Sequence, residues 1–185
     1  MKKKLLSVLL TTSCIVNLSA KDSYIGLKLS KLDSDKTVIA NTSGYENIGP
    51  YERYEDFSLV GIEFQKLYSK QNSPFLWGAG GSLMLNDGKF FDGGMLNFDF
   101  KMGGHFDKLK AYGILGADIQ FLSEYTGATG IYYGIGATYD VSDNFGLTAN
   151  YTQHNMSTFI SEDDDLSNDQ DYKLSGFSLG ILYKY

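Results

Sequence analysis

The sequence predicts an all-β protein, an eight-stranded antiparallel up-and-down barrel that crosses a membrane with its strands. Two observations predict this class. Apolar residues alternate with small or polar ones at a period of two in one segment after another, as in a strand with one face in lipid and the other in a narrow interior. The chain also ends on an alternating aromatic and aliphatic stripe at residues 177–185, and closure of a barrel removes the edge that such a strand would expose.

The first 20 residues predict a secretory signal peptide. Lysines at residues 2–4 precede an apolar run at residues 5–16, and small or polar residues follow up to Ala20. This order is typical of a leader, and the run is too short to span a bilayer as a helix. We therefore expect a cleaved leader at residues 1–20 and one barrel domain at residues 21–185.

Cys14, the single cysteine, lies inside the predicted leader. An alternative is the lipid-anchoring cysteine of a lipoprotein, but Thr11 stands where an aliphatic residue is expected. Without its leader the chain would have no thiol, so we expect no disulfide and no thiolate metal site. We also expect no cofactor.

Composition excludes one class of partner and favours strands. Without the leader lysines, 13 basic side chains face 22 acidic ones, a formal net charge of −9, whereas nucleic acid binding requires a basic surface. The chain has 21 glycines, 14 tyrosines, 12 phenylalanines and only 2 prolines, a composition that suits β-structure. No later segment reaches the roughly 18 apolar residues of a membrane helix, so any membrane insertion must use strands.

The first four predicted strands lie within residues 24–103, and each has outward apolar residues at a spacing of two. Their outward residues are Ile25, Leu27 and Leu29; Val60, Ile62 and Phe64; Phe75, Trp77, Ala79, Gly81, Leu83 and Leu85; and Leu96, Phe98, Phe100 and Met102. The connections are predicted at residues 31–56, 69–74 and 86–93.

The last four predicted strands follow a turn around Asp107 and show the same alternation. Their outward residues are Leu115, Ala117, Ile119 and Phe121; Ile131, Tyr133, Ile135, Ala137 and Tyr139; Phe145, Leu147, Ala149 and Tyr151; and Phe177, Leu179, Ile181, Tyr183 and Tyr185. A long polar connection is predicted at residues 155–171. Alternation alone also permits a water-soluble barrel with its apolar faces turned inward around a ligand.

One hairpin points to a family. Residues 133–153, YGIGATYDVSDNFGLTANYTQ, combine a glycine-spaced strand, a turn at Ser142, Asp143 and Asn144, and a second strand that ends near an Asn-Tyr pair. The segment resembles the penultimate hairpin of opacity-protein and OmpA/OmpX-like outer-membrane barrels, and the terminal stripe resembles their aromatic assembly signature. The resemblance implies a porin-family outer-membrane barrel of a Gram-negative bacterium, in a family whose members range from adhesins to structural proteins.

Alternating connection lengths predict the orientation. Long external loops and tight periplasmic turns alternate in such barrels, which places both chain ends on the periplasmic side. Amphipathic rings belong at headgroup level, and this orientation predicts a periplasmic aromatic girdle. The girdle consists of Phe64, Trp77, Phe100, Tyr139, Phe145, Tyr183 and Tyr185.

Five charged residues fall on the inward faces of the predicted strands: Lys28, Glu63, Asp99, Lys101 and Asp118. Unpaired buried charge is costly, so we expect these side chains to pair across the interior. A small barrel is filled by its side chains. The pattern therefore favours a polar plug over the alternative of a narrow ion-conducting pore.

Two further groups suggest chemistry. The acidic segment at residues 161–171 includes Glu162, Asp163, Asp164 and Asp165, which could bind a divalent cation but lack the spacing of a calcium loop. A solvated loop is the simpler interpretation of such a segment.

His154, with Ser157 and Glu162 behind it, has the residue types of acyl transfer. The group resembles the site of lipid A deacylases, where the serine falls two residues after the histidine; that position is Met156 here. A lone loop histidine is more often polar surface.

The sequence therefore predicts a non-enzymatic outer-membrane barrel that acts through its long external loops; a lipid A hydrolase and a narrow pore are the alternatives. The expected partners are outer-membrane lipid, lipopolysaccharide and, through Tyr185, the barrel assembly machinery.

Overall fold

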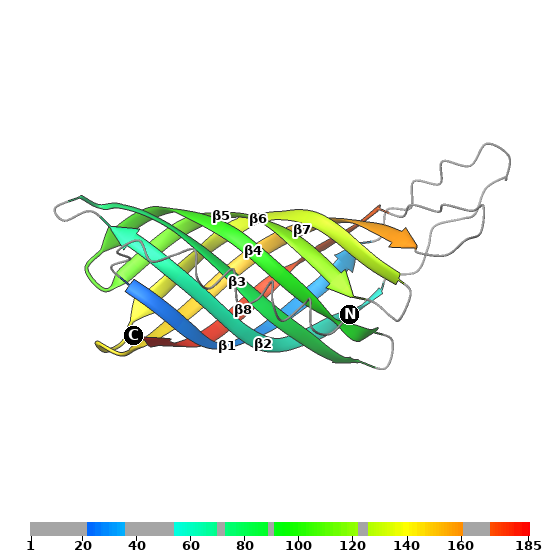
Figure 1. The fold of residues 1–185 in the computed structure, drawn as a ribbon, viewed down its shortest axis with the longest axis horizontal. Helices are drawn as coiled ribbons and strands as arrows, with labels where there is room; N and C mark the ends of the chain where they lie inside the picture. The colour runs from blue at the N-terminus through cyan, green and yellow to red at the C-terminus, as the bar shows by residue number, and fades with distance from the viewer. Residues whose placement is uncertain (1–21, 36–53, 70–72, 89–90, 122–125, 161–170) are drawn as a thin grey trace, which may run out of the picture.

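A computed structural model describes residues 22–35, 54–69, 73–88, 91–121, 126–160 and 171–185. Eight strands form one closed antiparallel barrel in chain order, and the last pairs with the first (Figure 1). The strands are β1 (Asp22–Asp35), β2 (Tyr54–Ser69), β3 (Phe75–Gly88), β4 (Phe91–Phe106), β5 (Leu109–Phe121), β6 (Thr126–Asp140), β7 (Phe145–Ile160) and β8 (Asp171–Lys184). The predicted eight-stranded up-and-down barrel is confirmed. Among the described residues there is no helix long and apolar enough to cross a membrane.

The strands are strongly staggered around the barrel. Stepping from each residue to its paired neighbour returns to β1 ten residues further on, by the route Tyr24, Gln65, Gly80, Asp99, Gly116, Tyr132, His154, Leu174 and Ser34. With ordinary strand spacing, this stagger corresponds to a strand tilt of about 40°. Inward side chains that are far apart in the sequence therefore meet at one level.

The large apolar side chains form the outer wall. Leu27, Ile135 and Phe177 are 65%, 69% and 67% exposed, and the outward residues of the other strands are similar in character. Lipid is the solvent that suits such a surface, since backbone groups of a closed barrel are satisfied internally. This arrangement excludes the water-soluble barrel, in which these side chains would face inward.

The two ends of the barrel differ. We call the end that holds Asp22 and Tyr185 the turn end; β4 and β5 join there through residues 107–108, and β6 and β7 through residues 141–144 (Figure 1). Asp107 has a φ of 54°, a left-handed conformation that Asp tolerates better than most residues. The opposite end, reached by β1, β3, β5 and β7 at their last residues, is called the loop end.

Three predicted connections were too long. β1 continues to Asp35 and β7 to Ile160, while Asn86 pairs with Gly93 inside a ladder that continues to Gly88 and Phe91. Toward the loop end the alternation reverses. There the inward residues Leu32 and Met156 are apolar and buried, while the polar residues Lys31 and Ser157 face outward. The outward apolar residues therefore stop before these strands end.

Candidate functional site

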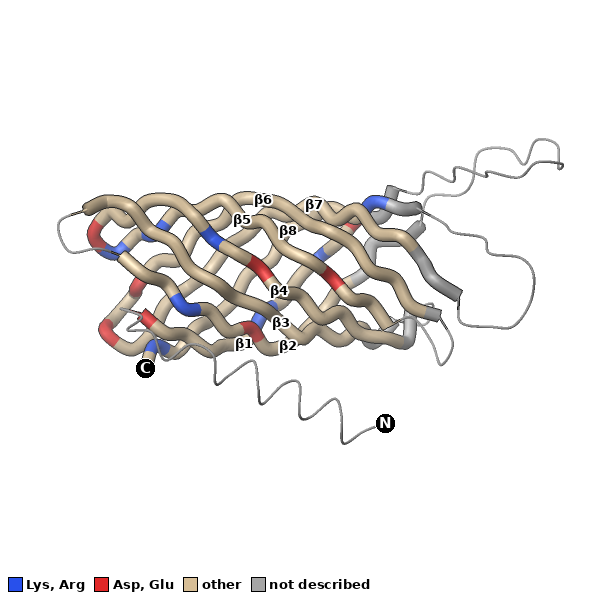
Figure 2. The backbone as a smooth tube through the Cα atoms, turned by 45° about the horizontal axis from the view of Figure 1, so that its top comes forward, with Lys and Arg blue, Asp and Glu red and all other residues tan. Residues whose placement is uncertain are grey.

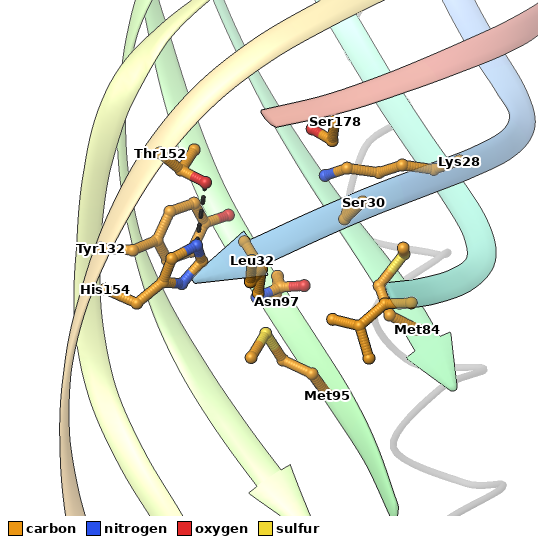
Figure 3. Close-up of a pocket in the computed structure, with 11 residues that line it drawn as sticks. Lys28, Ser30, Leu32, Met84, Met95, Asn97, Tyr132, Thr152, His154 and Ser178 are labelled. Atoms are coloured by element: carbon orange, nitrogen blue, oxygen red, sulfur yellow. Dashed lines mark hydrogen bonds between the residues drawn. The ribbon is translucent and has the colours of Figure 1, made fainter. Parts of the chain in front are cut away.

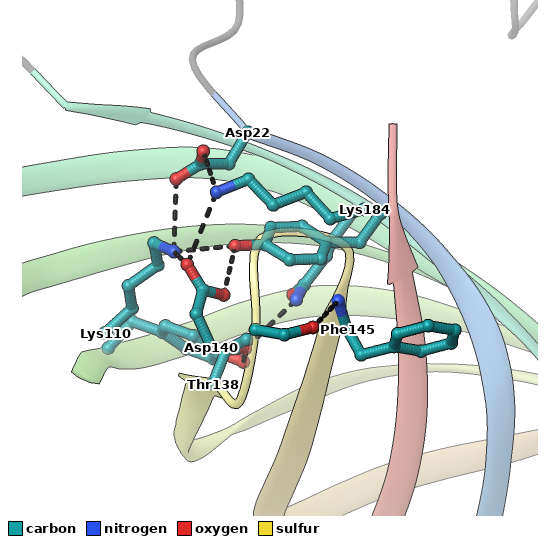
Figure 4. Close-up of polar contacts among 10 residues, drawn as sticks. Asp22, Lys110, Thr138, Asp140, Phe145 and Lys184 are labelled. Atoms are coloured by element: carbon teal, nitrogen blue, oxygen red, sulfur yellow. Dashed lines mark hydrogen bonds and ion pairs between the residues drawn. The ribbon is translucent and has the colours of Figure 1, made fainter. Parts of the chain in front are cut away.

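The polar interior has a densely paired cluster at the turn end. Lys110 Nζ lies 2.5 Å from Asp140 Oδ2 and 3.1 Å from Asp22 Oδ2, and it donates to Tyr24 OH at 2.6 Å. Tyr24 OH donates to Asp140 Oδ1 at 2.7 Å, and Lys184 Nζ lies 2.6 Å from Asp22 Oδ1 (Figure 4). Charges of both signs gather at this end of the backbone tube (Figure 2).

This turn-end cluster joins four strands, β1, β5, β6 and β8, across the seam where the first and last strands meet. None of its members is among the five predicted interior charges. Its members occupy inward positions, with Lys110 on the same face of β5 as Asp118, so strand parity was the available signal. These residues lie near the ends of their strands, where the predicted alternation gave no clear sign of the cluster.

The five predicted interior charges all come from inward positions around the middle of the barrel. Lys101 Nζ lies 3.1 Å from Asp99 Oδ1, and Tyr132 OH donates to Asp99 Oδ2 at 2.9 Å. Lys28 and Glu63 carry opposite charges and occupy inward positions of the paired strands β1 and β2. Glycines provide the room: a Cβ at Gly80 would lie 2.6 Å from Lys101 Nζ.

Asp118 belongs to a separate chain of hydrogen bonds centred on His154. His154 Nδ1 lies 2.7 Å from Asp118 Oδ2, and its Nε2 lies 2.9 Å from Thr152 Oγ1. Asn97 Nδ2 donates to the other oxygen of Asp118, and the His154 ring stacks on Tyr132 at a centroid distance of 4.9 Å. His154 is therefore held on both nitrogens inside the barrel.

The structure does not bring His154 and Ser157 together. His154 is buried on the inward face of β7, whereas Ser157 is exposed on the outward face of the same strand. An odd separation places two strand residues on opposite faces. Glu162, Asp163, Asp164 and Asp165 lie outside the described residues. Within the described ranges, no group of three His, Cys, Asp or Glu side chains could hold a metal ion.

One small cavity lies beside His154, with a volume of about 20 Å³. Lys28, Asn97, Tyr132 and Thr152 are among its polar lining residues, and Met84 and Met95 close it toward the loop end (Figure 3). This volume is that of about one water molecule. Beyond it, buried apolar side chains fill the lumen: Leu32, Leu59, Met84, Met95, Ala128, Met156 and Leu174. We call this group the apolar seal.

The aromatic residues predicted as a girdle all lie exposed on the outer wall, with relative accessibilities between 40% for Phe64 and 70% for Tyr185. Trp77 stacks on Tyr68 at 4.3 Å, and the Phe145 and Tyr183 rings meet edge to face at 5.7 Å. Such contacts order the rings along the wall of the turn end.

Comparison with known proteins gives a family and a fold. The family model described as the outer membrane protein beta-barrel domain matches residues 5–185. The structure is similar to OprG from Pseudomonas aeruginosa, with a TM-score of 0.51, 14% identity, and coverage of 89% of this chain and 95% of that one. Ail of Yersinia pestis gives a TM-score of 0.43 and 17% identity, with 89% and 99% of the two chains covered. Neisserial surface protein A gives 0.42 and 12%, with 85% and 95% covered. No curated protein matches the sequence.

Proposed function

The chain belongs to the outer membrane protein β-barrel domain family, and we propose that it acts through the surface of its loop end. We further propose that the barrel conducts no ions and performs no catalysis. It is an integral β-barrel protein of the bacterial outer membrane. The filled interior is the observation that carries the proposal.

The described interior is closed at two levels. The turn-end cluster fills one mouth with ion-paired side chains, and the apolar seal fills the lumen beneath the other. Between them lies a cavity of only about 20 Å³, as expected for an eight-stranded barrel that its own side chains fill. A solute would have to disrupt both levels, so the barrel serves as a rigid support for its external surface.

The proposed orientation places the turn end, and both termini of the mature chain, in the periplasm. The spacing of the strands supports it: no connection at the turn end is longer than the five residues 70–74, whereas the two longest connections, of 18 and 10 residues, join β1 to β2 and β7 to β8 at the loop end. Short turns are periplasmic and long connections external in this class of barrel. Residues 36–53 and 161–170, which lie outside the described residues, then form external loops that bind a partner or shield the surface. A cleaved leader at residues 1–20 and recognition of Tyr185 by the barrel assembly machinery complete the proposal.

Two single-cysteine variants test the orientation. The mature chain would contain no cysteine, so Asn168→Cys and Asp143→Cys each supply one thiol, in a proposed external loop and in a turn-end connection. A membrane-impermeant maleimide should label Asn168→Cys on intact cells and Asp143→Cys only after the outer membrane is permeabilised. Labelling of Asp143→Cys on intact cells would refute the orientation.

Planar-bilayer recording tests the absence of conduction. The purified, refolded barrel should give no stepwise conductance over a range of voltages, because the turn-end cluster and the apolar seal fill the described interior near its two ends. Reproducible steps that vanish in a heat-denatured sample would contradict the proposal and favour a pore.

A further inference from the structure

The apolar seal contains three methionines. Met84, Met95 and Met156 are 1%, 1% and 2% exposed and belong to one cluster of buried side chains. Of the five methionines in the chain, Met1 belongs to the predicted leader, and Met102 lies on the outer wall with 52% of its surface exposed. The thioethers of the barrel are therefore concentrated inside the lumen, toward the loop end.

The three side chains come from strands on opposite sides of the lumen. Met84 on β3 and Met95 on β4 are directly paired in the ladder, and side chains at such positions have Cβ atoms about 5 Å apart. β7, which carries Met156, lies opposite β3 in the closed ring of strands. A Cβ at Gly130, the β6 partner of Met156, would lie 2.7 Å from Met156 Sδ. Glycine at that position therefore leaves room for the third thioether inside the barrel.

The cavity of about 20 Å³ borders two of these methionines. Met84 and Met95 line it beside His154 (Figure 3). Its volume is that of about one water molecule, so it suits a single guest of that size or smaller. A methionine side chain is unbranched and has three rotatable bonds. Its sulfur atom can therefore turn into the cavity without a change of the backbone.

The barrel interior carries a negative formal charge. Among the inward positions whose side chains the structure describes, four lysines face five carboxylates, a formal charge of −1 with neutral histidines. These residues are Lys28, Lys101, Lys110, Lys184, Asp22, Glu63, Asp99, Asp118 and Asp140. Uncompensated charge is costly in a buried environment. One monovalent cation would bring this part of the interior to neutrality, even though Lys28 is among the residues that line the cavity.

We propose that Met84, Met95 and Met156 bind one soft monovalent metal ion, Cu(I) or its analogue Ag(I), at the cavity beneath the loop end. Thioethers are soft ligands that select Cu(I), whereas harder divalent ions prefer nitrogen and oxygen. Leucine fills three other positions of the same seal, so apolar packing alone does not require three thioethers there. A bound ion would join β3 and β4 to β7 across the lumen. This inference goes beyond the proposed function and does not depend on the orientation of the barrel.

The test titrates Ag(I) into the refolded mature barrel in neutral detergent and chloride-free buffer. Ag(I) shares the ligand preference of Cu(I) without its redox chemistry, and the mature chain would contain no cysteine to compete for it. Titration calorimetry should show saturable binding of one ion per barrel. Loss of groups that only support a metal site weakens binding by about 10–100-fold, so Met84→Leu/Met95→Leu, which removes two ligands, should weaken it by roughly 100-fold or more. The control Met102→Leu should bind as tightly as the wild type.

NMR of the wild type tests the site without relying on a variant. With isotope-labelled methionine methyl groups, Ag(I) should shift the resonances of Met84, Met95 and Met156 and leave that of Met102 unchanged. Leucine and methionine have similar volumes, so the double variant should fold, and heat-modifiability gels verify this.

Four results would overturn the inference. They are a wild-type barrel without saturable Ag(I) binding, a folded double variant that binds Ag(I) like the wild type, an Ag(I)-induced shift confined to the Met102 methyl group, and Zn(II) binding that is as tight as Ag(I) binding and is lost in the double variant. Cysteine labelling and conductance test the proposed function separately, so a failure of the metal site is distinguished from a failure of that function.

Discussion

Replacing Lys110 by Met should destabilise the barrel more than any change to an exposed lysine. The Lys110 side chain is 1% exposed and is the cation between Asp22 and Asp140, with a further hydrogen bond to Tyr24. Its loss leaves two carboxylates facing each other in a buried mouth. Met has a similar length, so the loss is chiefly electrostatic.

The size of the effect follows from what remains. Breaking a buried ion pair by removing one partner costs about 3–5 kcal/mol. Lys184 stays 2.6 Å from Asp22 and 3.4 Å from Asp140 and is 25% exposed, so it offsets part of the charge. We therefore expect the free energy of unfolding to fall by about 3 kcal/mol, the low end of that range.

Urea unfolding of the barrel in lipid vesicles measures this change. Trp77 is the single tryptophan and lies on the outer wall, so its fluorescence reports the loss of lipid contact. Lys108→Met in the exposed β4–β5 turn is the control and should stay within about 0.5 kcal/mol of the wild type. The double variant Lys110→Met/Asp140→Asn should recover part of the loss, because one unpaired carboxylate is removed.

A Lys110→Met barrel within about 0.5 kcal/mol of the wild type would refute this reasoning. It would mean that Lys184 and water compensate fully, and that the turn-end cluster contributes no net stability.

Three further predictions use the same barrel. Asp107→Val should lower the free energy of unfolding by about 1–2 kcal/mol, because a β-branched residue is strained at a φ of 54°. Asp107→Gly should not lower it, and equal stability of the two variants would contradict this prediction. Gly80→Val should lower the free energy of unfolding by about 1–3 kcal/mol, because the larger side chain overpacks against Lys101. The control Gly113→Ala, at an open outward position, should leave that free energy nearly unchanged. A Gly80→Val barrel as stable as the wild type would show that the interior can accommodate the larger side chain. Tyr185→Asp should lower the free energy of unfolding in vesicles by at most about 1 kcal/mol, since a charge near the interface is tolerated. The same change should strongly reduce the amount of folded protein in the outer membrane, measured by heat-modifiability gels of isolated membranes. Normal levels there would show that Tyr185 is not an assembly signal.

The sequence by itself determined the strand count and which residues of each strand share a face. β4 illustrates this, because Leu96, Phe98, Phe100 and Met102 could only share one face. The structure then showed that the apolar faces point outward, where lipid is the solvent they require. The inward positions of Asp99 and Lys101 followed from the same parity. The same parity separates His154 from Ser157, because an odd spacing places two residues on opposite faces of one strand.

The tertiary structure decided which inward side chains meet. Alternation indicates which face of a strand a residue lies on, but not its position along the barrel axis. That position depends on the stagger between strands, which adds up to ten residues around the barrel. That stagger brings Asp118 to His154 and Lys110 to both Asp22 and Asp140. It also decided how far β1 and β7 extend, because beyond the hydrocarbon region the outer face turns polar and the inner face apolar. Local patterns report only the solvent on each face of a strand, whereas register depends on the packing of all eight strands at once.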